Sequence, residues 1–325
     1  MNSSYLIQRL MHAILVVFVV SVIAFLLGSF TGDPVTSVLG VDATPEARAA
    51  LRMRLGLDDP LLLQYVRYLG RVFTGDFGMS YIAQRPVIDV ILERVPATLE
   101  LAATALVFSL GIGIPLGVIA AVHHRKMWSS ALMTISVVGV SLPTFVVGIF
   151  LILIFSVTLG WLPSFGRGET VRLGGWETGL LTPSGLRSLL LPGFALAISQ
   201  VALVARLVRA EMLEVLRAEY IRFARARGIP DNRVNFKHAL RNTLIPIITV
   251  SGIQLGYLLA FAVVVEQVFQ WPGLGTLFLS ALTQTDLPVV TAFLMVVACF
   301  FVFTNLVVDF LYALADPRLK MGAKA

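Results

Sequence analysis

Long uncharged apolar runs, separated by shorter polar segments, dominate this 325-residue chain. Hydrocarbon offers no water to backbone amide groups, so a chain crosses a bilayer only as helices or as a closed barrel. These runs are too long and too uniform for barrel strands, which alternate over about 10 residues. Windows of about 20 residues predict an all-α membrane protein with six spans, at 10–30, 97–122, 131–159, 188–205, 244–265 and 288–314.

The segments between these spans differ in their content of lysine and arginine. Residues 206–243 carry nine Lys and Arg against four acidic residues, and Arg125 and Lys126 in 123–130 face no acid. The segment 266–287 has neither Lys nor Arg. Because short basic loops stay inside, both termini and the segments 123–130 and 206–243 are predicted to be cytoplasmic.

The spans divide the chain into four regions. Residues 1–30 form a tail and a retained first span, because the apolar stretch exceeds the core of about 7–15 residues in a signal peptide. Residues 31–96 form an external loop, 97–315 a membrane core that includes the basic segment 206–243, and 316–325 a cytoplasmic tail.

The external loop is predicted to be partly helical. Thr44 and Pro45 can begin a helix over 47–57, which Gly56 would end. A second helix is expected over 61–73, with one apolar face formed by Leu62, Tyr65, Val66, Leu69 and Phe73.

Composition excludes several kinds of chemistry. Of the residues, 57% are hydrophobic and 14% are charged, against about a quarter charged in soluble domains. The single cysteine, Cys299, permits no disulfide within the chain. Walker A, G-x-S-x-G and H-E-x-x-H sequences are missing, so no catalytic, cofactor-binding or metal-binding residue is expected. The net charge of +6 is accounted for by the loops, and no nucleic-acid partner is expected.

Small and polar residues within the spans have separate interpretations. Gly113 and Gly117, and likewise Gly252 and Gly256, have the spacing that lets two helices approach closely. Ionisable residues in spans are functional candidates, but an ion pair or a helix cap is the favoured interpretation for Glu100, Glu266 and Asp309. The polar residues Gln200, Gln254 and Glu266 form a possible translocation path, although glutamines also bridge helices by hydrogen bonds.

The basic segment itself has helical order. Leu213, Leu216, Tyr220 and Phe223 recur at helical spacing, and Gly228 can end this helix in the left-handed conformation. After the turn, Asp231 or Asn232 would cap a second short helix over 233–240. Two interpretations stay open: a docking element for a soluble cytoplasmic partner, or a basic loop that lies on anionic headgroups.

At these residues the chain resembles the membrane subunits of ATP-binding-cassette importers. Their signature is E-A-A, three residues, G, nine residues and I-x-L-P, in which Gly228, Ala224 and Leu240 match. The departures at Arg222, Phe223, His238 and Arg241 are similar to those of the dipeptide and oligopeptide branch, specifically its B-type subunit. Agreement with that branch extends over nearly the whole chain, in segments that include 75–78, 94–100, 266–275 and 316–318.

The resemblance implies a transport subunit of a bacterial inner membrane that does no chemistry itself. A second, C-type permease would complete the path, two cytoplasmic ATPases would hydrolyse ATP, and an external binding protein would deliver a peptide. The residues implied to dock on an ATPase are Glu219, Tyr220, Arg222, Phe223, Ala224, Arg225, Gly228, Asp231, His238 and Arg241. Closure of the ATPase dimer would then alternate access by a hinge motion.

Other functions remain as alternatives. The same branch of importers handles glutathione, nickel and some sugars as well as peptides. A stand-alone secondary transporter would show inverted repeats, and no clear repeat is present in the sequence. A membrane-embedded enzyme would need a buried nucleophile, a metal pair or a carboxylate cluster, and none is apparent in the sequence.

Overall fold

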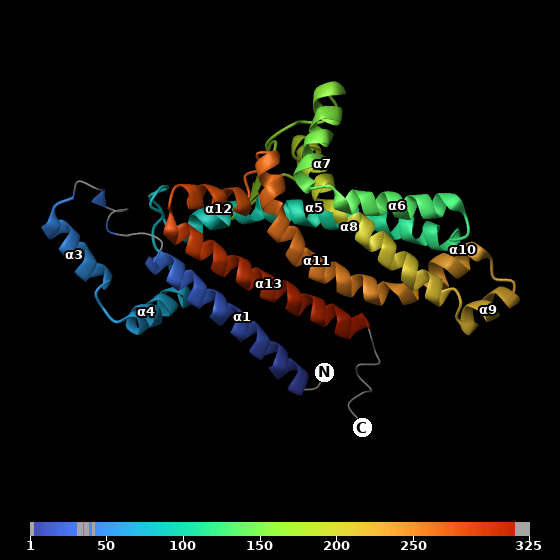
Figure 1. Ribbon diagram of the computed structural model, residues 1–325, viewed down its shortest axis with the longest axis horizontal. Helices are drawn as coiled ribbons and strands as arrows, with labels where there is room; N and C mark the ends of the chain where they lie inside the picture. The colour runs from blue at the N-terminus through green and yellow to red at the C-terminus, as the bar shows by residue number, and fades with distance from the viewer. Residues whose placement is uncertain (1–2, 31–34, 36–38, 41–42, 316–325) are drawn as a thin grey trace. The chain divides into compact units, whose positions relative to one another are not determined.

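A computed structural model describes residues 3–30, 35, 39–40 and 43–315 of the chain (Figure 1). Helices predominate, as the sequence predicts, and the predicted tail at 316–325 lies outside the described residues. The helices are α1 (Ser3–Phe30), α3 (Pro45–Leu55), α4 (Leu61–Phe73), α5 (Val87–Val122), α6 (Met127–Ser141), α7 (Thr144–Leu151), η1 (Ile152–Thr158), α8 (Pro183–Val215), α9 (Glu219–Ala226), α10 (Asp231–Arg233), η2 (Val234–Ala239), α11 (Leu240–Val268), α12 (Leu274–Thr283) and α13 (Leu287–Ala315). Two short antiparallel strands, β1 (Val171–Leu173) and β2 (Trp176–Thr178), form a hairpin.

Five of the six predicted spans coincide with single helices of the structure. Within the described residues, five helices are long and apolar enough to cross a membrane: Ile7–Phe30, Val87–Val122, Pro183–Val215, Pro246–Val268 and Leu287–Val308. The predicted span 188–205 lies inside the much longer helix α8, which continues through Pro192. The all-α membrane fold is therefore confirmed.

The third predicted span, 131–159, is wrong as a continuous helix. Helix α6 ends at Ser141, and Leu142 adopts an extended conformation with φ −79° and ψ 129°. The cause is Pro143, which removes a backbone donor and disfavours the helical conformation of the residue before it. The chain then resumes as α7 and the π-helical segment η1, which ends at Thr158.

The chain divides into two compact units, one of which contains Pro96–Gly273 and Thr304–Ala325. In this unit α8 contacts α11, α6 and α7 (Figure 1). Gly113 and Gly117 of α5 lie directly against α8, where an added Cβ at Gly117 would stand 2.6 Å from the Ala205 carbonyl oxygen. Gly252 of α11 likewise lies against the Val308 side chain. The predicted close helix packing at these glycines is confirmed.

The other unit contains Asn2–Val95 and Leu274–Phe303. Helix α3 begins with the Thr44 hydroxyl accepting from the Ala47 amide and ends at Gly56, where φ is 66°. Both helices predicted in this region are thus present. The predicted apolar face of α4 is largely exposed, however, and the contact with α1 is made by aromatic residues, with the Tyr65 hydroxyl 2.8 Å from Ser21 Oγ.

A buried carboxylate, that of Asp286, connects two segments of this unit. Asp286 accepts hydrogen bonds from the Ser80 hydroxyl and from the Tyr81 amide at 3.1 Å. Burial, together with the Asp286 charge, raises the pKa of Tyr81. Nearby, the rings of Phe278 and Phe293 stack with centroids 4.4 Å apart. The segment before α5 is thereby tied to the start of α13.

The close approach of α5 and α8 generates a prediction. Gly117→Ala should lower the free energy of unfolding by about 1–3 kcal/mol, the usual cost of overpacking, because the new methyl group meets Val208 and the α8 backbone. Gly111→Ala in the same helix is the control, since nothing lies within 4 Å of that position. Thermal unfolding of the two detergent-purified variants checks this, and equal unfolding temperatures would contradict it.

Candidate functional site

The predicted docking region begins where α8 ends. A short turn at 216–218 separates α8 from α9, and Ala218 is extended with φ −64° and ψ 146°. Helix α9 then packs through Ile221 and Ala224 against a core that includes Met212 and Val234. The side of α9 that faces this core is therefore formed by the apolar side chains of Ile221 and Ala224.

The apolar positions Leu213, Leu216, Tyr220 and Phe223 do not form one continuous helical face, because a turn divides the predicted helix. Leu213 and Leu216 pack against this core, but Tyr220 and Phe223 are 45% and 63% exposed. The turn at 216–218 interrupts the helix and changes which positions face inward, so Ile221 and Ala224 take the buried places. The two aromatic rings consequently lie on the outer face of α9.

Gly228 ends α9 as predicted. Its φ is 75°, in the left-handed region, and its amide donates to the Arg225 carbonyl at 2.9 Å. The next amide, that of Ile229, donates to the Ala224 carbonyl at 3.3 Å. These two bonds form a Schellman motif, which fixes the direction in which the chain leaves the helix.

The second short helix differs from the prediction. Pro230 rather than Asp231 or Asn232 stands at the helix start, and no side chain caps it. Helix α10 continues through the π-helical segment η2 directly into α11. The segment from Asp231 onwards is therefore a helical extension at the start of the membrane span α11. Its apolar residues Val234 and Ala239 pack on the same core as α9.

The ten predicted docking residues divide by exposure. Ala224 is buried in the core and His238 is half-buried. The other eight are exposed: Glu219, Tyr220, Arg222, Phe223, Arg225, Gly228, Asp231 and Arg241. Together with α9 itself, these eight define what we call the coupling surface.

Contacts within the coupling surface order its side chains. Arg222 pairs with Glu219 at 2.7 Å and Arg225 with Asp231 at 3.4 Å. The Asn242 amide donates to the Tyr220 hydroxyl at 2.6 Å. Exposed ion pairs contribute little to stability, typically about 0–1 kcal/mol, so these contacts arrange the charges without holding the fold together.

The three candidate path residues lie in different settings. Glu266 is 0% exposed, accepts from the Thr98 hydroxyl at 2.6 Å and lies against Gly273. Gln254 is half-buried on the same helix, about 18 Å away along its axis at 1.5 Å per residue. Gln200 lies half-buried on α8, and its Oε1 is buried without a hydrogen-bond partner among the described residues.

Glu266 belongs to a group of buried contacts around the end of α11. The Trp271 indole donates to the Ala97 carbonyl at 2.9 Å, and Trp271 is fully buried. An added Cβ at Gly273 would overlap the Glu266 carboxylate. These contacts join α5 to the turn after α11 and give Glu266 a structural role, with partners that its sequence position alone did not reveal.

A buried ion pair connects α5 to the segment before α8. Arg167 Nη2 lies 2.8 Å from Glu100 Oε2, and the two side chains are 7% and 3% exposed. The same guanidinium group donates to the Glu177 carbonyl at 2.6 Å, and the Gly179 amide donates to Glu100 at 3.4 Å. The ion pair expected for Glu100 is confirmed, and Arg167 is its partner.

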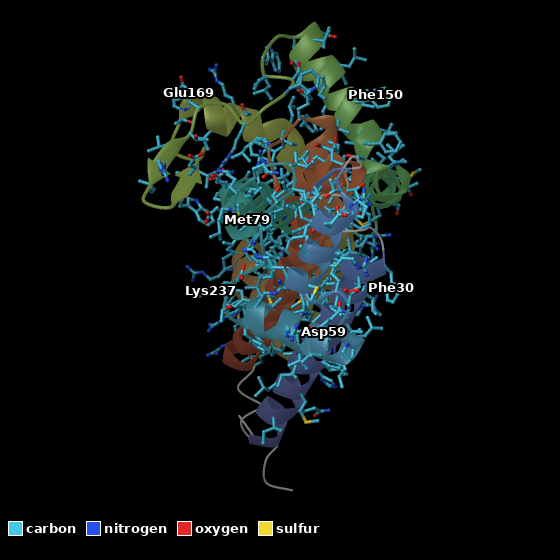
Figure 2. The ribbon with its side chains drawn as sticks, turned by 90° about the vertical axis from the view of Figure 1, so that its left-hand side faces the viewer. Phe30, Asp59, Met79, Phe150, Glu169 and Lys237 are labelled. Atoms are coloured by element: carbon cyan, nitrogen blue, oxygen red, sulfur yellow. The ribbon has the colours of Figure 1, made fainter. Side chains whose placement is uncertain are left out.

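The β1–β2 hairpin lies within the segment held by this pair. Glu169, labelled in Figure 2, precedes β1, and its carbonyl accepts from the Thr182 hydroxyl at 2.6 Å. Thr182 also accepts from the Gly185 amide at 3.0 Å, which caps the first turn of α8. The hairpin is thus attached both to α5 and to the start of α8.

Comparison with protein families identifies the chain. Residues 113–321 match the binding-protein-dependent transport system inner membrane component family, and residues 2–102 match the N-terminal region of such membrane components. The chain belongs to this family. It is therefore a membrane permease component of an ATP-binding-cassette transporter and not an enzyme.

Relatives of the permease extend over its whole length. It is 40% identical over 318 residues to the glutathione transport system permease protein GsiC of Shigella flexneri, covering 98% of this chain and 99% of the relative. The protein of the same name from Escherichia coli is also 40% identical. A putative peptide transport system permease protein of Brucella melitensis is 39% identical over 322 residues, with the same coverage.

Solved structures agree on the fold. A chain of the MetNI methionine ABC transporter, in an inward-facing conformation, matches with a TM-score of 0.52 at 18% identity. The match covers 68% of the permease and 93% of that chain. A second crystal form of MetNI gives a TM-score of 0.53. At this identity the likeness supports the membrane fold alone.

The buried ion pair of the permease leads to a prediction. Arg167→Ala should destabilise the protein by about 3–5 kcal/mol, because it leaves the Glu100 carboxylate buried without its cation. Arg172→Ala is the control: Arg172 is exposed in the hairpin, so a change within about 0.5 kcal/mol is expected. Adding Glu100→Gln to the first variant should recover part of the loss. Equal unfolding temperatures for the two single variants would refute the assignment.

Proposed function

We propose that the permease imports short peptides, including glutathione, and that it couples to a cytoplasmic ATPase through the coupling surface. In this proposal a second, C-type permease completes the translocation path. Two ATPases hydrolyse ATP, and an external binding protein delivers the substrate. Both termini and residues 206–243 lie in the cytoplasm.

The docking proposal rests on the difference between the two sides of α9, of which one is buried and the other exposed. One side, with Ile221 and Ala224, is anchored in the core at the end of α8. The other side presents Tyr220 and Phe223 with arginines beside them, and Arg227 lies over the Phe223 ring, 5.3 Å from its centroid. Aromatic residues and arginine are the side chains enriched at protein interfaces.

The anchoring gives the docking helix a mechanical connection to the spans. Helix α9 is joined to α8 by the turn at 216–218, and to α11 by the Gly228 turn followed by the continuous helical segment of α10 and η2. A displacement of α9 by an ATPase would therefore be passed to both helices. Closure and opening of the ATPase pair would then alternate the access of the path, as in other hinge-type transitions.

Two kinds of support bear on the substrate. The relatives at about 40% identity carry the names of glutathione and putative peptide permeases, and glutathione is itself a tripeptide. The half-buried amides of Gln200 and Gln254 can hydrogen-bond the amide groups of a peptide. Short peptides are therefore the class of solute that we assign to this transporter.

Gly228 offers a test of coupling that separates backbone geometry from bulk. An added Cβ at Gly228 meets nothing within 4 Å, but its φ of 75° is strained for side-chain-bearing residues. Gly228→Val should abolish substrate-stimulated ATP hydrolysis and uptake while membrane insertion persists, because β-branched residues reject this conformation. Gly228→Asn, which tolerates it, should retain most of both activities.

The measurement uses the complete transporter in proteoliposomes, with uptake of labelled glutathione and of a labelled dipeptide followed beside ATP hydrolysis. Normal coupled transport by the valine variant would refute the role of the Gly228 turn. Loss of activity in both variants would also refute it, since steric bulk rather than backbone direction would then be the cause.

A further inference from the structure

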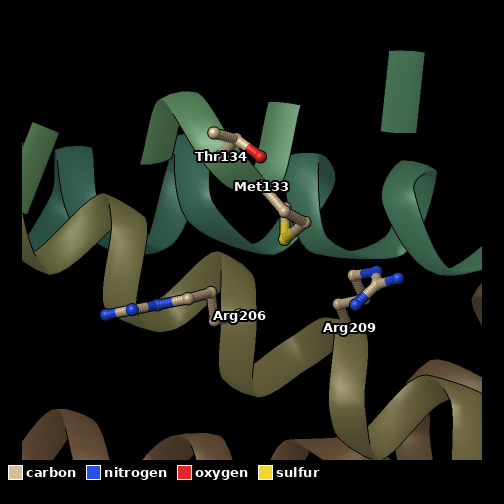
Figure 3. A pocket seen from close by; sticks show the side chains of 4 residues that line it. All are labelled: Met133, Thr134, Arg206 and Arg209. Carbon is tan, nitrogen blue, oxygen red and sulfur yellow. The ribbon is translucent and has the colours of Figure 1, made fainter. Parts of the chain in front are cut away.

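Two arginines of α8 line a hollow that the proposed docking role does not use. Arg206 and Arg209 lie one turn apart on α8, opposite Met133 and Thr134 of α6 (Figure 3). The hollow has a volume of about 330 Å³, many times the ~30 Å³ that one water molecule occupies in the liquid. All four residues belong to the unit that contains Pro96–Gly273.

Neither arginine is neutralised within the described part of the chain. Both side chains are half-buried, and Arg209 Nε is a buried donor that finds no hydrogen-bond partner there. Arg167 differs from these two arginines, because the charge of its buried side chain is compensated by Glu100. Leaving a buried charged donor unsatisfied costs more than leaving a neutral one. Two uncompensated guanidinium groups around one hollow therefore indicate a site for an anion.

The position of the hollow restricts which anion reaches it. Arg206 directly follows the apolar run 188–205, and α6 begins at Met127. Thr134 is seven residues further on, about 10 Å along the helix at 1.5 Å per residue. Because headgroups add only about 5–8 Å on each side of the hydrocarbon, the hollow lies close to the boundary between headgroups and acyl chains.

We propose that this hollow binds the phosphate of an anionic phospholipid of the cytoplasmic leaflet; only the choice of leaflet rests on the proposed orientation. A planar guanidinium group can bind two phosphate oxygens through two parallel hydrogen bonds. Basic pockets between spans on the cytoplasmic side are suited to lipid headgroups. The Thr134 hydroxyl donates to the Ser130 carbonyl at 3.1 Å, so the donors for the phosphate come from the arginines. Their guanidinium groups point in different directions in Figure 3 and would turn towards each other to share one phosphate.

The apolar wall of the hollow favours a lipid over a soluble anion. Met133 forms part of the lining and is its apolar side chain. An acyl chain that continues from a bound headgroup would cover this side chain. A soluble phosphate would leave it in water, which costs free energy in proportion to the apolar area exposed.

The test measures lipid binding by the assembled, detergent-purified transporter, without ATP or substrate. Phosphatidylglycerol should raise the unfolding temperature saturably, and phosphatidylcholine should not. Arg206→Gln/Arg209→Gln should weaken the apparent affinity at least about tenfold, the effect expected for losing charge-assisted hydrogen bonds. Arg206→Lys/Arg209→Lys, which keeps the charges but loses the planar fork, should fall between.

Arg125→Gln/Lys126→Gln is the matched control, because it removes two exposed charges from the same predicted side of the membrane and should bind like the unchanged protein. Equal binding by the Arg206→Gln/Arg209→Gln variant would overturn the proposal, as would the same effect from inorganic phosphate. A lack of any phosphatidylglycerol effect on the assembled complex would overturn it in favour of a partner subunit covering the hollow. ATP hydrolysis, measured separately, shows whether coupling fails independently.

Discussion

The close approach of α5 and α8 is the constraint on which the rest of the permease depends. Gly113 and Gly117 bring the two backbones together without intervening side chains. In hydrocarbon such van der Waals contact replaces the hydrophobic effect as the main attraction between helices. Helix α8 is thereby held among α5, α6, α7 and α11, and its far end carries α9. The position of the coupling surface is thus determined by packing inside the membrane core.

Local chemistry was enough to predict much of this fold. Apolar runs identified five spans, Thr44 and Gly56 gave the ends of α3, and Gly228 gave the end of α9. The misses have physical reasons. Composition over 131–159 looks continuous, although Pro143 divides it. The pairing of Arg167 with Glu100 joins residues 67 positions apart, and no periodic pattern specifies such a contact.

The coupling surface shows the same division between local and non-local information. Sequence spacing found the helix and its glycine, but it placed Tyr220 and Phe223 on one continuous helix with Leu213 and Leu216. The turn at 216–218 changed the helical phase, so Ile221 and Ala224 face the core instead. The exposure of Tyr220 and Phe223 supports the docking proposal, because the resemblance already implied that these two residues contact an ATPase. It also separates the anchoring residues from those proposed to make contact.

The most direct measurement is cysteine cross-linking between α9 and the ATPase. The only native cysteine, Cys299, can be replaced by serine, and Phe223→Cys or Phe73→Cys introduced singly; both positions are exposed. With a short bifunctional reagent, position 223 should cross-link to the ATPase of the assembled transporter, with a yield that changes on ATP binding, and position 73 should not. An assembled complex that cross-links equally at both positions, or only at 73, would contradict the proposed docking.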